Sequence, residues 1–126
     1  MELIVHMTIG EVSKKFGMTA DTIRYYERIG LLPYIPRQKN GIRDFDEEAC
    51  KWVSFIKCMR GAGVQIEALI EYVTLMKNGD DPQRRKEILV QQRAKLLDRL
   101  KQLQDTIERL DFKIEHYNEL ILGAKK

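Results

Sequence analysis

An apolar repeat with steps of three and four residues runs through the last third of the chain. Its members are Leu89, Leu96, Leu100, Leu103, Ile107, Leu110, Ile114, Tyr117 and Ile121, and its single gap falls at Arg93. This spacing gathers apolar side chains on one stripe of a helix and is typical of a coiled-coil seam. A helix of about 40 residues is about 60 Å long, so the small domain that precedes it cannot cover the stripe. We therefore expect a partner helix, supplied most simply by a second copy of the chain in a homodimer.

Two short helices separated by a glycine are predicted near the start of the chain. The segment Thr8-Ile-Gly-Glu11 has the capping-box pattern, in which the Thr and Glu side chains accept each other's backbone N–H groups, and it predicts a helix over 9–16. Gly17 provides the positive φ that commonly ends a helix. Thr19 is a suitable N-cap for a second helix over 20–29. Two helices joined by so short a turn form the helix-turn-helix pattern.

A segment that cannot be helical follows the second helix and reads PYIPRQKNGIRDF. Pro33 and Pro36 exclude a helix, and Asn40-Gly41 is the strongest short signal for a β-hairpin turn. We expect a small β-hairpin here and call this segment the wing. Apolar periodicity predicts two more helices, over 47–60 and 66–77. The expected fold class is all-α with a small β-hairpin wing: a winged helix-turn-helix head and a long C-terminal dimerisation helix.

Positive charge is concentrated in the second helix and the wing. Five Lys or Arg residues stand between Arg24 and Arg43, counting both ends, although the net charge of the whole chain is only +3. A local basic cluster of this kind is the electrostatic footprint of a nucleic-acid-binding surface. On the wing, Arg37, Lys39 and Arg43 are expected to contact phosphates beside a DNA groove.

The second helix has the residues that a helix in the major groove needs. Small residues with hydroxyl groups, Thr19 and Thr22, stand at its N-terminal turn. Arg24 is within reach of a base edge, and arginine is the commonest bidentate partner of guanine. Tyr25 can donate a hydroxyl hydrogen bond to a phosphate, and Arg28 can contact the DNA backbone farther along the groove. We interpret this segment as a recognition helix for double-stranded DNA.

The sequence argues against several other function classes. No apolar run approaches the about 18 residues that a membrane helix requires. On one helix Cys50 and Cys58 would lie roughly 12 Å apart, whereas bridged Cα atoms lie within about 7 Å, so they cannot form a disulfide with each other within one chain. The two histidines, His6 and His116, lie outside the predicted head helices, and no nucleophile–base arrangement is recognisable. We expect a cytoplasmic protein that is not an enzyme and needs no cofactor, metal ion or membrane.

A family of bacterial transcription regulators resembles this chain from Thr8 onward. The resemblance rests on IGEVSKKFGMTADTIRYYERIGLL, on the wing and on the RDFDEEA segment. The family is that of the mercury-resistance regulator (MerR), and it implies a winged helix-turn-helix head and an antiparallel coiled-coil dimer. Such dimers bind a pseudo-palindromic promoter element with an unusually long spacer. In the activated form they bend and untwist the DNA, so that RNA polymerase meets both promoter boxes on one face.

The resemblance implies a set of DNA contacts and a domain organisation. The DNA contacts are carried over to Thr19, Thr22, Arg24, Tyr25, Arg28, Arg37, Lys39 and Arg43. The expected organisation is an N-terminal extension over 1–7, a DNA-binding domain over 8–77, a linker over 78–81, a coiled-coil dimerisation helix over 82–122 and a tail over 123–126.

The positions of the two cysteines indicate which kind of signal the regulator responds to. Metal-sensing family members carry cysteines at the start of the long helix and beyond it, whereas this sequence has none after Cys58. The segment SFIKCMRGAG resembles the branch that responds to aldehydes, reactive electrophiles and nitrosative stress, so Cys58 is a candidate sensor. Cys50 is interpreted as structural. Two alternatives stay open: Cys58 packs under the partner's helix, or a small ligand binds without a covalent bond.

A second function class is compatible with the same features. A coiled-coil adaptor would also dimerise, and it would use the basic head on an acidic protein or a membrane surface. The two classes differ in DNA discrimination, because a regulator prefers one site over random DNA and an adaptor does not.

Overall fold

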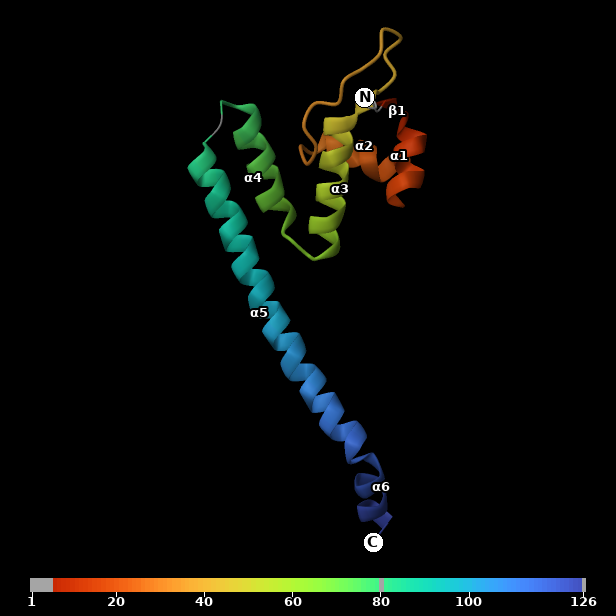
Figure 1. The fold of residues 1–126 in the computed structure, drawn as a ribbon, viewed down its shortest axis with the longest axis vertical. Coiled ribbons are helices and arrows are strands. Elements are labelled where there is room, and N and C mark those ends of the chain that lie inside the picture. Colours follow the sequence, from red (N-terminus) through yellow and green to blue (C-terminus); the bar gives the residue numbers. More distant parts are fainter. Residues whose placement is uncertain (1–5, 80, 126) are drawn as a thin grey trace, which may run out of the picture. The chain divides into compact units, whose positions relative to one another are not determined.

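The computed structural model describes residues 6–79 and 81–125. Its elements are β1 (His6–Met7), α1 (Ile9–Phe16), α2 (Ala20–Arg28), β2 (Phe45–Asp46), α3 (Glu47–Gly61), α4 (Ile66–Lys77), α5 (Pro82–Glu115) and α6 (Tyr117–Lys125) (Figure 1). This mostly helical architecture with a minimal sheet and a long C-terminal helix confirms the expected fold class. The chain divides into two compact units, one ending at Gln92 and the other beginning at Arg93. No helix of the described residues combines the length and apolarity needed to cross a bilayer.

The helix starts follow the local signals in the sequence. Thr8 and Glu11 form the expected capping box, with the Glu11 N–H 3.2 Å from Thr8 Oγ1 and the Thr8 N–H 3.0 Å from Glu11 Oε1. Gly17 follows α1 with φ of 65°, in the left-handed region that glycine adopts without strain. Asp46 caps α3, since its carboxylate accepts the Ala49 N–H at 2.8 Å. These caps satisfy backbone donors that a helix start leaves unpaired.

The core of the first unit consists of apolar side chains from every helix in it. The buried residues are Val12, Ile23, Leu31, Leu32, Ile35, Phe45, Ala49, Cys50, Val53, Ile56, Val64, Leu69, Val73 and Ile88. Ile88 shows that the first turns of α5 belong to this core. A hydrogen bond also joins α5 to α4: the Nε–H of Arg84 on α5 donates to Oε1 of Glu71 on α4 at 2.8 Å. Helix α2 is fixed to the same core through Ile23.

The wing is held together by fewer strand contacts than a regular hairpin. A single bridge joins Arg37 and Arg43, and the Gln38 N–H lies 2.8 Å from the Ile42 carbonyl oxygen. Gly41 adopts φ of 85° in the turn, as the Asn-Gly signal requires. In Figure 1 the wing is the orange loop that projects between α2 and α3.

A sheet of two strands, each two residues long, lies at the base of the wing and was not anticipated from the sequence. β1 pairs antiparallel with β2, with His6 opposite Asp46 and Met7 opposite Phe45. A His6 Nδ1 to Asp44 Oδ2 distance of 2.9 Å supports the pairing. Residues 6 and 7 therefore pair with the strand that precedes α3, whereas the sequence predicts an N-terminal extension over 1–7.

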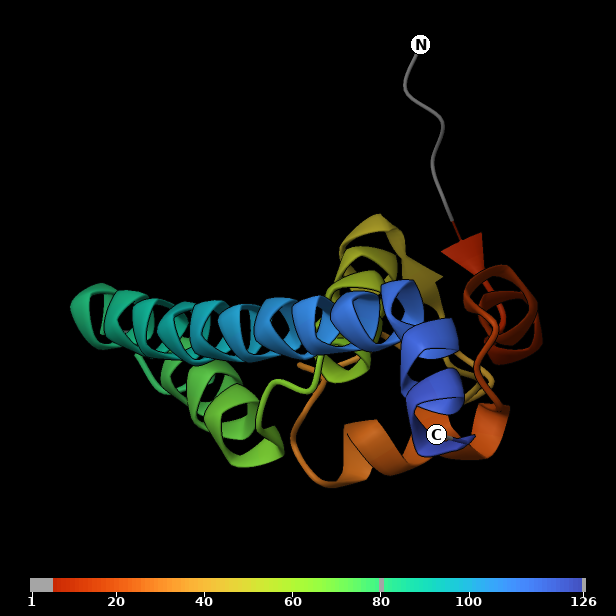
Figure 2. The same cartoon turned by 90° about the horizontal axis from the view of Figure 1, so that it is seen from below.

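The long helix is interrupted near its end. We predicted one helix over 82–122, but α5 ends at Glu115 and α6 begins at Tyr117. His116 lies between them, its ring stacked on Phe112 at 4.2 Å between centroids and its Nδ1 2.9 Å from the Phe112 carbonyl oxygen. The same carbonyl oxygen also accepts the His116 backbone N–H at 3.0 Å, so the regular helical bond at this residue is kept and the break follows it. Figure 2 shows α6 turning away from the axis of α5.

Candidate nucleic-acid interface

The N-terminal turn of α2 is organised by two threonine hydroxyls. Thr19 Oγ1 accepts the backbone N–H of Thr22 at 3.1 Å, and the two hydroxyl oxygens lie 2.8 Å apart. Thr19 is exposed and Thr22 is half-buried. The turn therefore combines a capped helix start with hydroxyl groups near the positive end of the helix dipole, where an anionic phosphate is stabilised.

Arg24 is exposed but has a carboxylate partner in the free protein. Its Nη1 lies 2.9 Å from Asp21 Oδ1, with 45% of the Arg24 side chain and 95% of the Asp21 side chain exposed. An ion pair this exposed contributes only about 0–1 kcal/mol, so exchanging Asp21 for a DNA partner costs little. The signal for this pair in the sequence is the three-residue spacing of Asp21 and Arg24, which places the two side chains on the same face of the helix.

The remaining outward residues of α2 form an aromatic and cationic surface. Tyr25 is 43% exposed, and the Arg28 guanidinium lies 5.4 Å from its ring centroid. Tyr26 is half-buried, with its ring 6.1 Å from that of Tyr25. Since Ile23 points into the core, α2 presents Tyr25 and Arg28 to the outside along with Arg24.

Two wing arginines contact α2 rather than extending freely into solvent. Arg43 Nε lies 3.0 Å from Glu27 Oε1, and an Arg37 guanidinium nitrogen lies 3.6 Å from the same oxygen. Arg37 Nη1 also donates to the Gly41 carbonyl at 3.1 Å. The third wing cation, Lys39, is exposed. The structure thus brings two of the predicted wing cations, Arg37 and Arg43, against α2 through a Glu27 contact that the sequence pattern did not indicate.

The predicted coiled-coil seam lies mostly on the surface of the single chain. The exposed seam residues are Leu89, Leu100, Leu103, Ile107, Leu110, Ile114, Tyr117 and Ile121, whereas Leu96 is half-buried. From Leu100 to Ile121 the row is uninterrupted, and such a row of large exposed apolar side chains is unusual for a monomer and indicates an interaction surface.

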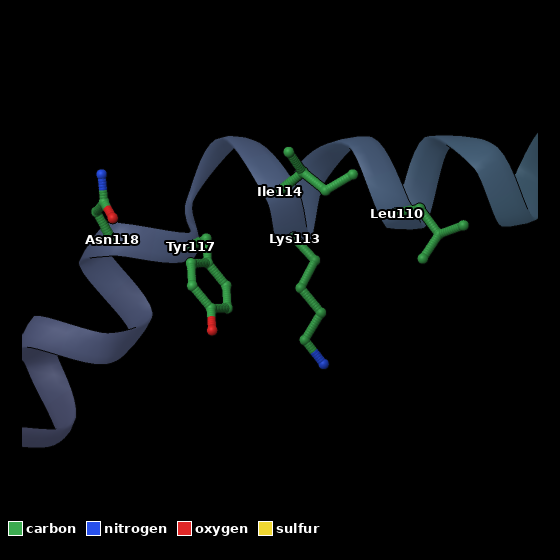
Figure 3. A pocket seen from close by; sticks show the side chains of 5 residues that line it. All are labelled: Leu110, Lys113, Ile114, Tyr117 and Asn118. Atoms are coloured by element: carbon green, nitrogen blue, oxygen red, sulfur yellow. The ribbon is translucent and has the colours of Figure 1, made fainter.

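A shallow hollow of about 430 Å³ lies at the junction of α5 and α6. Its lining residues are Leu110, Lys113, Ile114, Tyr117 and Asn118, and Figure 3 shows the side chains of Lys113 and Tyr117 on the same side of the helices. Three of the five belong to the predicted seam. The hollow is therefore part of the surface on which a partner helix is expected.

The two cysteines of α3 have different environments. Cys50 is buried, with Sγ 3.7 Å from the Phe45 carbonyl oxygen, and both thiols are free. Burial is the main influence on the Cys50 thiol and raises its pKa. The nearby Lys15 lowers this pKa, and the nearby Asp46 raises it further. Cys58 is exposed. Among the described residues no cluster of three or more His, Cys, Asp or Glu side chains could hold a metal ion.

More than half of the chain matches one family of known proteins. Residues 7–75 match the profile of the MerR HTH family of regulatory proteins. The chain is 56% identical over 93 residues to the HTH-type transcriptional regulator AdhR of Bacillus subtilis (strain 168), an alignment that covers 73% of this chain and 66% of that protein.

Two crystal structures have the same fold. A protein from Listeria monocytogenes assigned to the MerR family has 45% sequence identity and a TM-score of 0.86, covering 94% of this chain and 91% of the other. HiNmlR, described as a MerR family regulator lacking the sensor domain and bound to promoter DNA, has 24% identity and a TM-score of 0.83, covering 91% and 92%. At that identity the second likeness concerns the fold alone.

Proposed function

Because the chain belongs to the MerR family of helix-turn-helix regulatory proteins, we propose that it is a homodimeric transcription regulator acting on one promoter palindrome. DNA binding and transcription regulation come with the family, while the dimer, the palindrome and the mechanism are our proposal. The observation that carries it is the placement of Arg24, Tyr25 and Arg28 on the outer side of a core-anchored α2. The wing cations lie beside this helix in the same compact unit.

Each residue type has a distinct part in the proposed complex. Arg24 reads a base edge in the major groove, because its planar fork matches the two acceptors of guanine. The hydroxyl groups and the other cations contact phosphates and fix the register without reading sequence. These phosphate-contacting residues are Thr19, Thr22, Tyr25, Arg28, Arg37, Lys39 and Arg43.

The seam would bring two heads onto one DNA duplex. A two-fold dimer presents the same surface twice, so its operator has matching two-fold symmetry. We propose an antiparallel coiled coil of two α5 helices with α6 at each end. Gripping both half-sites at once allows the dimer to bend and untwist the DNA between them, and RNA polymerase then engages the distorted promoter.

The proposal is tested by footprinting the purified protein on the DNA upstream of its own gene and on other loci that carry an overlong promoter spacer. We expect protection of one palindrome and an affinity at least about a thousandfold above that for random DNA. Specific binding should also weaken steeply with salt, because phosphate contacts release counterions. Equal affinity for all DNA would refute the regulator and favour a coiled-coil adaptor.

We further propose that Cys58 senses aldehydes or other electrophiles. Its exposure is the supporting observation, since the buried Cys50 has a raised pKa and is thereby less nucleophilic. With an aldehyde, Cys58 Sγ would bond to the carbonyl carbon while the carbonyl oxygen takes up the thiol proton, giving a hemithioacetal.

Replacing Cys58 with alanine should abolish the increase in transcription that an aldehyde causes, while leaving operator affinity unchanged. The measurement is in vitro transcription from the protected promoter, with and without formaldehyde. Cys50→Ala is the matched control, because it removes the other thiol of α3, and it should keep the response. A full response in Cys58→Ala would exclude this cysteine and favour a ligand that binds without a covalent bond.

A further inference from the structure

Building on the DNA-binding role proposed above, we propose that Glu27 is a positioning residue that fixes the wing to the recognition helix. Its carboxylate holds the guanidinium groups of Arg43 and Arg37 against α2. The helix and the wing would then reach the duplex as one preorganised surface.

The contact geometry identifies Glu27 as the common partner. One oxygen, Oε1, accepts the Arg43 Nε–H at 3.0 Å and lies 3.6 Å from an Arg37 nitrogen. Among the described residues, every ion pair or side-chain hydrogen bond found between the wing and α2 ends on this carboxylate. Glu27 is therefore the α2 partner that both wing arginines share, and Arg37 has a second partner in the Gly41 carbonyl.

Burial makes this contact different from an ordinary surface ion pair. The side chains of Arg43 and Glu27 are 23% and 22% exposed. Charges partly withdrawn from water interact more strongly and are screened less by salt than exposed pairs. We therefore expect the Arg43–Glu27 pair to persist in moderate salt, whereas the exposed Arg24–Asp21 pair opens readily.

Within the described part of the chain, no other hydrogen bond or ion pair joins the tip of the wing to α2. Its base is fixed, because Ile35 and Phe45 are buried and the Asp44 N–H lies 2.7 Å from the Pro36 carbonyl oxygen. Residues 37–42 are all exposed. The orientation of this tip relative to the recognition helix consequently depends on Glu27.

Glu27 also limits the positive charge that the wing offers to any DNA. The wing carries three cations and the Asp44 carboxylate, a net charge of +2, and Glu27 lowers the local charge to +1. In the wild type, Glu27 holds Arg37 and Arg43 in the orientation that fits operator phosphates; a neutral residue at position 27 would free them to reach phosphates of any sequence as well. Because phosphate contacts add affinity without specificity, discrimination between operator and random DNA should fall.

The test compares Glu27→Gln with the wild type on the footprinted operator and on a random duplex, by fluorescence anisotropy at several salt concentrations. We expect binding to random DNA to strengthen and the specificity ratio to fall by about tenfold, which corresponds to about one mismatched base pair. The slope of log affinity against log salt on random DNA should steepen by about one for each released arginine.

The matched control is Glu71→Gln, which removes a carboxylate paired with Arg84 between α4 and α5, away from the interface. It should leave both the specificity ratio and the salt slope unchanged. The positioning role would be overturned if Glu27→Gln also left the specificity ratio and the salt slope unchanged. It would likewise be overturned if Glu27→Gln lowered the affinity for operator and random DNA equally without a change of the salt slope. A wild type that cannot discriminate operator from random DNA would instead refute the proposed function itself.

Arg43→Lys provides an independent measurement, since lysine retains the charge but lacks the Nε–H that bonds to Glu27. If Glu27 acts through Arg43, the double variant Glu27→Gln/Arg43→Lys should lose little more specificity than either single variant. Strictly additive losses would mean that the two residues act separately, contrary to the proposal.

Discussion

Ile107→Asp is expected to convert the dimer to a monomer and to abolish operator binding. Ile107 lies in the middle of the seam, and 55% of its surface is exposed in the single chain. In a two-helix seam this surface would be buried against the partner, so the substitution would bury a carboxylate from each copy. Burying unpaired charges costs about 4 kcal/mol or more, which raises the dimer dissociation constant a thousandfold or more.

The measurement is sedimentation velocity over a range of protein concentrations, followed by titration of the operator. Ala94→Asp is the matched control, because it puts the same charge on the same helix but opposite the seam at about 3.6 residues per turn. It should remain dimeric and bind normally. A dimeric Ile107→Asp variant would show that α5 uses a different face, or that the dimer forms elsewhere.

The elements of the head could be predicted from the sequence because their signals are local. A capping box spans four residues, so Thr8 and Glu11 identify the start of α1 without any knowledge of the tertiary structure. The same reasoning applies to Thr19 at α2 and Asp46 at α3. The seam is also a local signal, because periodicity on one helix does not require its partner to be known.

The missed features depend on contacts between distant segments. β1 pairs with a strand about forty residues later, and a two-residue strand has no periodicity of its own. Glu27 meets Arg43 sixteen residues away, because the wing folds back onto α2. The break at His116 carries neither proline nor glycine, so no local breaker announced it.

The candidate site shows the same division. Its residue types and their helix were visible in the sequence, since arginine and tyrosine at those positions fit groove and phosphate contacts. Their partners in the free protein were not. Arg24 is held by Asp21, and Arg37 and Arg43 are held by Glu27. The interface is therefore less positive before DNA binds than the count of its cations indicates.

Arg24→Ala is the second large effect that we expect, and it distinguishes base reading from phosphate contact. Specific binding should weaken by about 1–3 kcal/mol, with a relaxed preference at one base pair of each half-site, while random DNA is bound nearly as before. The substitution also breaks the ion pair between Arg24 and Asp21. This changes the binding free energy little, because the pair is exposed. The measurement is a competition assay between the operator and operators mutated one base pair at a time.

Lys39→Ala provides the contrast that gives this result its meaning. Lys39 is an exposed wing cation that we assign to phosphate, so its loss should weaken binding to operator and random DNA alike and reduce the salt slope by about one. If Arg24→Ala behaved in the same way, Arg24 would be a phosphate contact. Base recognition would then have to come from other outward groups of α2, of which Tyr25 and Arg28 are the first to substitute, because both are exposed on the same helix.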